Sequence, residues 1–477
     1  MTKPNILLIT DDQHRWDFML NAGPARTPSL NRLASEGVTL DNVYSNCPIC
    51  MPTRFTWLHG LYASQASAGL LDNAGDWPGH LPTVAQALQK EGYYTALIGK
   101  LHSLGGLHHR DVVSFEGQTL KRGFHYAFEV GGKSLSYWYD CRWTRHLRHK
   151  GLLERYRQDV ASRTAMIGGT ERHEPSFLSS EDHVDGFIGK HALSWLENYS
   201  ESRPFFLHAS FCGPHFPLDP SPEYFEHHRP EDMPPPVASR NRDGQILEDG
   251  EGDSRSKWQE HRALYCGLIE QVDREIGKIL DLLVKKGWQR NTLVIFTTDH
   301  GDMIGDLGYN HKGLAFDAAC RTPVIVRFPG SQTPSPIAGP VISGPAEAVD
   351  LPCAILDAAG AGDKTAQYLP GTPGVSWLGY ARGDNPQPRA WAYSECRQGM
   401  AAWRMCREPD WKYVFKANGD DMLFDMREDP HEQLNLAGLP EHKDRTSRMR
   451  RQLVHRMTGA MAPASAFGPG SLSRDDL

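Results

Sequence analysis

NILLITDD, residues 5–12, and LVIFTTDH, residues 293–300, are the two stretches that decide the fold. Each is a short run of apolar, mostly branched side chains; the first ends in Asp-Asp and the second in Asp-His. Short runs that are apolar throughout are typical of strands in a sheet covered by helices on both faces. Ligands of such sheets bind at the carboxyl ends of the strands, so the two polar pairs are the first candidates for a functional site.

Similar apolar runs recur along the chain between segments with helical periodicity. We predict further strands at 95–99, 204–210 and 323–328, and helices at 29–36, 83–91, 183–199 and 261–286. This alternation predicts an α/β fold in which one large, mixed and mostly parallel sheet is sandwiched by helices.

A second, smaller unit is predicted at the end of the 477-residue chain, because single cores stop growing well before this length. Residues 360–388 are rich in Gly and Pro and lack helical periodicity. Beyond them we predict strands at 390–393, 411–415 and 422–424 and a helix at 442–457. We therefore divide the chain into a catalytic α/β domain, 1–375, and a C-terminal α+β subdomain with a short antiparallel sheet, 376–477. Residues 229–257, mostly polar after PPP, are predicted to form a long surface excursion.

The charge balance limits the classes of partner. The chain carries 51 basic and 58 acidic residues, a net charge of -7, which argues against a nucleic-acid-binding protein. Any anionic substrate must be held by a few placed cations. No run approaches the roughly 18 to 20 apolar residues of a membrane span, and the start of the chain shows no cleavage site of the signal-peptide type. We expect a cytoplasmic protein without a membrane partner; the sequence leaves a homo-oligomer open.

More polar residues follow the predicted strands. Lys100 and His102 follow 95–99, His215 follows 204–210, and Lys312 lies beyond 293–300. A lone Lys or His in a loop is usually solvated or packed, but here all would lie at the same edge of the sheet.

The acidic strand ends would repel each other without a cation between them. Carboxylates suit Ca²⁺ or Mg²⁺, whereas an imidazole leaves Mn²⁺ or Zn²⁺ open. For a single strand-end Asp the ordinary alternative is a helix cap or a loop hydrogen bond. Two polar pairs at two strand ends favour a metal.

Residues 47–54, CPICMPTR, contain two overlapping signals. Cys47 and Cys50 have the C-x-x-C spacing of a redox dithiol or half a zinc site, whereas Cys50, Pro52 and Arg54 form C-x-P-x-R. No second C-x-x-C supplies zinc ligands, and the remaining cysteines are scattered. A helix start with a nearby Arg is a natural seat for a tetrahedral oxyanion.

The motifs, taken in order, resemble the sulfatase family of the alkaline-phosphatase-like superfamily over nearly the whole chain. They are PNILLITDDQ (4–13), TPSLNRLASEGVTLDNVYSNC (27–47), CMPTRFTWLHG (50–60), IGKLH (98–102), GPHFP (213–217), TTDHGDMIGDLGYNHKG (297–313), CRTPVIV (320–326) and LFDMREDPHEQLNL (423–436).

The resemblance implies a modified nucleophile and a metal. Cys50 would be oxidised to Cα-formylglycine by a formylglycine-generating enzyme, and the hydrated aldehyde would attack sulfur. Asp11, Asp12, Asp299 and His300 would hold one divalent metal together with residue 50, with Ca²⁺ the first expectation and Mg²⁺ or Mn²⁺ the alternatives.

The resemblance also implies roles for the remaining site residues. Arg54 and Lys100 would orient and polarise the hydrate, and His102 would be the base that restores the aldehyde. His215 and Lys312 would grip the sulfate and assist the leaving oxygen. The expected reaction is hydrolysis of a small sulfate ester to an alcohol and inorganic sulfate.

Three positions in the family motifs bear on the choice between a sulfatase and other functions. His59 stands where the family's motif usually has Ser or Thr, and Trp57 where it has a small or aliphatic residue. The pairing of Asp299 with His is closer to choline sulfatases, some sugar sulfatases and phosphonate monoester hydrolases than to arylsulfatases. A phosphonate monoester or phosphodiester hydrolase using the same site is therefore the alternative reaction. The alternative of a different class is a non-hydrolytic redox, zinc or anion-binding protein.

The lining of the substrate pocket is a further prediction. Aromatic and basic residues after the Lys100 strand are candidates for its lining, although ordinary packing is the common alternative: His108, His109, Arg110, Trp138, Arg142 and Trp143.

Overall fold

The computed structural model describes residues 3–20, 23–73, 75–105, 111–163, 172–241, 245–246, 254–330, 339–384 and 389–460. Within them, eight strands form one sheet in the order β5-β4-β6-β1-β7-β8-β2-β9. Their bounds are β5 (Tyr126–Glu129), β4 (Tyr94–Gly99), β6 (Phe205–Pro214), β1 (Asn5–Asp12), β7 (Thr292–Thr298), β8 (Val324–Arg327), β2 (Val38–Leu40) and β9 (Val341–Ile342). Neighbouring strands pair in parallel except where β8 meets β7 and β2. The predicted mixed, mostly parallel sheet is confirmed.

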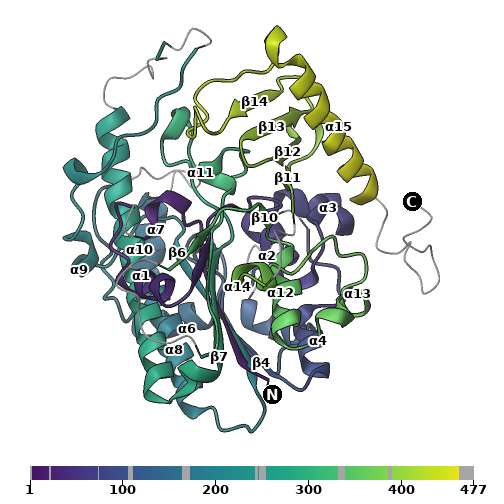
Figure 1. The fold of residues 1–477 in the computed structure, drawn as a ribbon. Helices are drawn as coiled ribbons and strands as arrows, with labels where there is room; N and C mark the ends of the chain where they lie inside the picture. Colours follow the sequence, from purple (N-terminus) through teal and green to yellow (C-terminus); the bar gives the residue numbers. More distant parts are fainter. Residues whose placement is uncertain are drawn as a thin grey trace.

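Helices cover both faces of this sheet (Figure 1). One layer contains α1 (Pro28–Ser35), α8 (Val184–Asn198) and α10 (Ser254–Lys285); the other contains α2 (Cys50–His59), α4 (Val84–Lys90) and α12 (Asp350–Ala358). Along β1, Leu7 and Ile9 pack into the first layer, and Ile6 and Leu8 into the second. Both faces are buried, which is why the strand is apolar throughout instead of alternating.

The other elements that accompany the large sheet are short. They are β3 (Val43–Tyr44) paired with β10 (Ala346–Glu347), and the helices α3 (Ala63–Ala66), α5 (Glu116–Lys121), α6 (Arg142–His149), α7 (Leu153–Arg163), α9 (Pro222–Phe225), α11 (Asp317–Cys320), α13 (Thr365–Tyr368) and α14 (Leu378–Arg382). None of the helices in the described residues is long and apolar enough to cross a membrane.

The predicted surface excursion at 229–257 is wrong at its end. Helix α10 already begins at Ser254, seven residues before the predicted start at 261. The first turns are polar and carry no apolar stripe until Trp258, whose ring is partly buried against the core, so periodicity could not find them. Residues 242–244 and 247–253 of the excursion lie outside the described residues.

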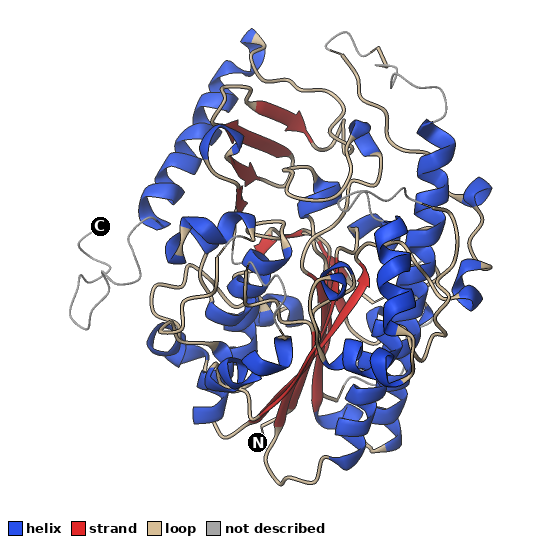
Figure 2. Ribbon diagram, turned by 180° about the vertical axis from the view of Figure 1, so that it is seen from behind, coloured by secondary structure: helices blue, strands red, loops and turns tan. Residues whose placement is uncertain are grey.

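The smaller antiparallel sheet is confirmed, and it has four strands in the described residues: β11 (Ala392–Cys396), β12 (Trp403–Arg407), β13 (Trp411–Lys416) and β14 (Met422–Asp425). Helix α15 (Lys443–Ala460) runs along it (Figure 2). The prediction missed β12, although its sequence WRMCR alternates apolar and charged residues at first. The boundary at residue 375 stays a prediction.

A buried ion cluster joins the smaller sheet to helix α11, which precedes strand β8 of the large sheet. Lys412 on β13 is fully buried, and its Nζ donates to Asp317 Oδ1 at 2.6 Å and Glu432 Oε1 at 2.5 Å. Asp317 begins α11, which follows the segment that carries Lys312. The cluster therefore fixes the smaller sheet against one wall of the site described below.

Replacing Lys412 by methionine is expected to lower the free energy of unfolding by about 3–5 kcal/mol, because it leaves two buried carboxylates without their cation. Urea denaturation would measure this loss. The matched control is Arg448→Ala, which breaks a pair with Glu408 in which Arg448 is 44% exposed and which should cost less than about 1 kcal/mol. Equal losses in the two variants would contradict the assignment.

Candidate active site

The strand order brings the predicted polar pairs together. Strands β4, β6, β1 and β7 are consecutive neighbours and all run in the same direction. Their carboxyl ends therefore meet at one edge of the sheet, where Lys100 follows β4, His215 follows β6, Asp12 ends β1 and Asp299 follows β7. This edge faces the smaller sheet (Figure 1).

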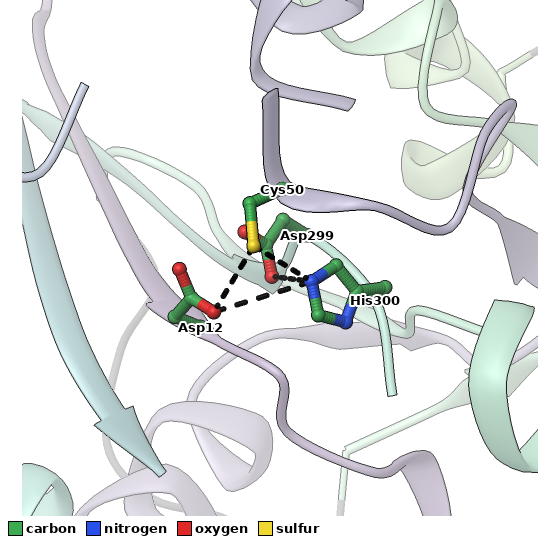
Figure 3. Close-up of side chains that lie close together, drawn as sticks. All are labelled: Asp12, Cys50, Asp299 and His300. Atoms are coloured by element: carbon green, nitrogen blue, oxygen red, sulfur yellow. Dashed lines mark hydrogen bonds and ion pairs between the residues drawn. The ribbon is translucent and has the colours of Figure 1, made fainter. Parts of the chain in front are cut away.

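Four buried side chains form a compact cluster at this edge: Asp12, Cys50, Asp299 and His300 (Figure 3). Their ligand-type atoms lie within 4.8 Å of one another. His300 Nε2 is 3.2 Å from Cys50 Sγ and 3.5 Å from Asp299 Oδ1. His300 Nδ1 lies 2.9 Å from the carbonyl oxygen of Gly301, to which it donates. In the neutral ring Nε2 then carries the lone pair, which is the tautomer that can bind a metal.

Cys50 lies at the first position of α2, with Pro52 in the first helical turn, where its missing N–H costs nothing. Its Sγ is 3.0 Å from Lys312 Nζ and 3.7 Å from Asp12 Oδ1. Burial raises the pKa of the Cys50 thiol, but the positive charges of Lys100 and Lys312 outweigh burial and hold the pKa well below its usual range. The position therefore favours an anionic oxygen or sulfur.

Arg54, one turn after Cys50 on the same helix, clamps the two strand-end carboxylates. Its Nε donates to Asp299 Oδ2 at 2.8 Å, and its Nη2 to Asp12 Oδ2 at 3.0 Å. Its Nη1 donates to the carbonyl oxygen of Lys100 at 2.7 Å. The guanidinium thus orients the acidic groups next to residue 50, and its positive charge also interacts with Cys50 itself.

Two lysines flank Cys50 from opposite sides of the cluster. Lys100 Nζ donates to Asp12 Oδ2 at 2.6 Å, and Lys312 Nζ donates to Gln13 Oε1 at 2.8 Å. Lys100 is 2% exposed. One buried cation, Lys100, and one partly buried cation, Lys312, beside a thiol at a helix start form a site for an anionic, tetrahedral group.

Two of the predicted histidines, His102 and His215, lie near Cys50. Burial lowers the pKa of His215 to about 4, with the charge of Lys312 acting in the same direction, and burial also lowers the pKa of His102. The nearby Cys50 thiol raises the pKa of both imidazoles, against the effect of burial. His102 has a φ of 59°, a backbone conformation uncommon for a residue with a side chain.

Asp11 is the one predicted metal ligand outside the four-residue cluster. Its Oδ2 accepts from His14 Nδ1 at 2.6 Å, while its Oδ1 is buried without a hydrogen-bond partner in the described residues. A buried carboxylate oxygen left unpaired is costly unless a cation takes it. The unpaired oxygen, the lone pair of His300 Nε2 and two further carboxylates fit a hard divalent ion.

Sequence reasoning missed Gln13. Its backbone N–H donates to Asp299 Oδ1 at 3.0 Å, and its side chain bridges Lys312 and Asp302. The signal was its place directly after the Asp-Asp pair, where the strand ends with a φ of 70°.

The C-x-x-C spacing does not correspond to a pair in space. Cys47 is buried in the core, where its Sγ lies 3.8 Å from the carbonyl oxygen of Leu71 and next to Cys396. All nine cysteines are free and buried. Among the described residues Cys47 thus lies beside Cys396 and outside the cluster of Cys50, so the C-x-x-C spacing does not mark a dithiol or a zinc site.

The residues that depart from the family motif have packing roles. The ring of His59 stacks on Phe55 at 4.5 Å, and burial lowers its pKa to about 3, so it is a neutral core residue. Trp57 is 5% exposed within the core. Neither side chain enters the cluster.

The residues suggested for the pocket lining have different positions in the structure. Trp143 is fully buried and belongs to the core, and Arg142 pairs with Glu116. Trp138 is exposed, and residues 108–110 lie outside the described residues.

Fold and site together define a class of protein: a helix-covered α/β enzyme fold that places a nucleophile-type residue beside a metal-type cluster at its strand ends. A family model described as Sulfatase matches residues 4–361. The chain belongs to the sulfatase family, and it has the alkaline-phosphatase-like fold predicted from its sequence.

Individual relatives cover almost the whole chain. An arylsulfatase of Clostridium perfringens is 28% identical, over 96% of this chain and 95% of the relative. A choline-sulfatase of Rhizobium meliloti is 29% identical, over 92% of this chain and 83% of the relative. A solved phosphonate monoester hydrolase of Silicibacter pomeroyi superimposes with a TM-score of 0.79 at 25% identity, covering 99% of this chain and 98% of that one.

Proposed function

We propose that the protein hydrolyses a small sulfate ester to an alcohol and inorganic sulfate, with residue 50 converted to Cα-formylglycine. The observation that carries the proposal is the position of Cys50 at the start of α2, between Lys100 and Lys312 and beside two carboxylates. This arrangement suits a nucleophile that attacks an anionic tetrahedral centre. A dithiol or a structural zinc site requires none of these neighbours.

Conversion of Cys50 would have to precede folding. The side chain is 1% exposed and lies beside three buried charged or polar neighbours, Asp12, Asp299 and His300. A modifying enzyme cannot reach it in the folded chain, so we propose that a formylglycine-generating enzyme acts on the nascent polypeptide. A cytoplasmic location stays a prediction.

The charged residues would bind the ester and orient its bonds. Lys100 and Lys312 would bind sulfate oxygens, and His215 would lie beside the leaving oxygen, where an anionic ester favours the charged form of the imidazole. His215 Nδ1 donates to the carbonyl oxygen of Phe216 at 2.7 Å, so Nε2 is the atom free to meet the ester. His102, next to residue 50, would accept the proton of the second hydrate oxygen.

Asp11, Asp12, Asp299 and His300 would hold one divalent metal together with residue 50, with Ca²⁺ as the proposed ion. When bound, the ion would supply positive charge to the sulfate oxygens and to the nucleophile. Arg54 holds Asp12 and Asp299 in place for it.

One comparison favours a second candidate function. The phosphonate monoester hydrolase covers nearly all of the chain at a TM-score of 0.79. A phosphonate monoester or phosphodiester would present the same tetrahedral anion to the same cations.

Steady-state kinetics on three substrates would separate the candidates. The protein would be produced together with a formylglycine-generating enzyme and loaded with metal. Its kcat/KM for 4-nitrophenyl sulfate or choline sulfate is expected to be at least about tenfold above that for a phenyl phosphonate ester. This ratio corresponds to about 1.4 kcal/mol in transition-state binding. Turnover of the phosphonate with inert sulfates would contradict the sulfatase proposal and support the second candidate.

A further inference from the structure

The segment that carries His215 is held by a buried polar network that takes no direct part in the site. Its members come from separate parts of the chain: Lys133 lies just after β5, Asp185 and His183 at the start of α8, Asp219 in the segment itself and Gln271 in α10. Each of these side chains is at most 1% exposed.

The network fixes the backbone on both sides of His215. Before it, Asp185 Oδ1 accepts from the N–H groups of Cys212 at 2.8 Å and Gly213 at 3.0 Å. After it, Lys133 Nζ donates to the carbonyl oxygen of Pro217 at 2.7 Å. His215 therefore lies between two anchored stretches of main chain.

The far end of the segment is anchored by the same network. Lys133 Nζ also donates to Asp219 Oδ1 at 2.9 Å. Gln271 Oε1 accepts from the N–H of Ser221 at 3.0 Å, and Gln271 Nε2 donates to His183 Nδ1 at 2.5 Å. His183 lies between the two carboxylates, with ring nitrogens 3.5 Å from Asp185 Oδ2 and 3.6 Å from Asp219 Oδ1.

A loop whose only role is to connect two elements would not need a buried network of charged and polar side chains. Burying charged groups is unfavourable, and a well-packed apolar substitute is often as stable as a buried ion pair. What charges and directed hydrogen bonds add over apolar packing is a fixed position for the backbone atoms that they bind.

The stretch before Lys133 also touches the other side of the site. Gly132 has a φ of 95°, and a Cβ added there would lie 3.5 Å from Lys100 Nζ. A short turn thus lies against one cation of the site while its next residue anchors the His215 segment.

We propose that Lys133, together with its partner Asp219, is a positioning residue that sets the place of the His215 imidazole against the bound ester. The inference rests on the proposed function only in that His215 touches the ester. Lys133 itself lies behind the segment, bound to Pro217 and Asp219, and acts through the backbone.

A double-mutant cycle with His215 tests the proposal. Lys133→Met should lower kcat/KM by about 10- to 100-fold, since displacements near 1 Å have effects of this size. His215→Ala should lower kcat/KM by about 10²- to 10⁴-fold. The double variant should lie within about threefold of His215→Ala alone, because residues that act as a unit are not additive. Effects that multiply in full would overturn the proposal, as would a Lys133→Met variant with wild-type kcat/KM.

Two further variants separate positioning from a general loss of structure. Lys133→Met combined with Asp219→Asn removes both charges, so that neither remains buried alone. Adding His215→Ala to this pair should lower kcat/KM little further than His215→Ala does alone. Arg327→Met breaks the pair of the buried Arg327 with the partly buried Glu36 at 2.7 Å; Arg327 lies beside Val294, near the start of β7 and at the opposite end of that strand from the site. This variant should lower the thermal midpoint and leave kcat/KM within about threefold of wild type.

The cycle is measured on whichever ester the wild-type protein turns over, 4-nitrophenyl sulfate or a phenyl phosphonate ester. Turnover of the phosphonate alone would refute the sulfatase proposal, and the cycle on that substrate would still decide the role of Lys133.

Discussion

Replacing Cys50 by alanine is expected to lower kcat/KM by about 10⁴-fold or more, because loss of a covalent nucleophile removes the step on which the other site residues act. The side chain is small, so its removal leaves the surrounding cations and carboxylates in place. Hydrolysis of the best substrate, followed with purified variants of matched metal content, would measure the loss.

The matched control is Cys47→Ala, three residues earlier in the chain. Cys47 is buried in the core and its thiol points to the carbonyl oxygen of Leu71. This variant should keep kcat/KM within about threefold of wild type and lose stability by an amount typical of a small core truncation. Equal loss of activity in Cys47→Ala and Cys50→Ala would favour the dithiol interpretation, because a dithiol needs both thiols.

Asp299→Asn is expected to have the second largest effect, with a loss of bound metal and a drop in kcat/KM of about 10³-fold or more. The substitution keeps the shape of the side chain but removes a negative charge from the cluster with Asp12 and His300. It also weakens the bond from Arg54 Nε, which Asp299 Oδ2 accepts at 2.8 Å. Metal content by elemental analysis and kcat/KM should fall together.

Asp273→Asn provides the control for this prediction. Asp273 is also a buried carboxylate, but it accepts from the N–H groups of Ser29 and Leu30 at the start of α1. Its substitution should lower stability and leave metal content unchanged. Retention of stoichiometric metal by Asp299→Asn would show that Asp299 is not a ligand.

The sequence predicted the large sheet because its central strands are buried on both faces. Such strands, β1 and β7 above all, are apolar through their central residues, and polar residues follow at their carboxyl ends. The strand ends could then be compared directly, and Asp12, Asp299 and His300 were found to lie together as expected. Strands of two or three residues, such as β2 and β9, have no pattern long enough to be recognised.

The internal order of the site could not be predicted, because it depends on contacts between residues far apart in the chain. The predicted action of Arg54 on residue 50 stays a prediction, but the sequence could not show that its guanidinium binds two carboxylates and a carbonyl oxygen. The role of Gln13 depends on Lys312, 299 positions away. Likewise, no spacing in the sequence connects Lys133 with Asp219.

The proposed reaction depends most on the chemical state of residue 50. The mass of the proteolytic peptide that contains this residue is the most direct test. In protein produced together with a formylglycine-generating enzyme, we predict a peptide about 18 Da lighter than the one with an unmodified cysteine. Across preparations, the measured kcat should rise in proportion to the fraction of the peptide that is converted. A fully active protein whose residue 50 is an unmodified thiol would contradict the account.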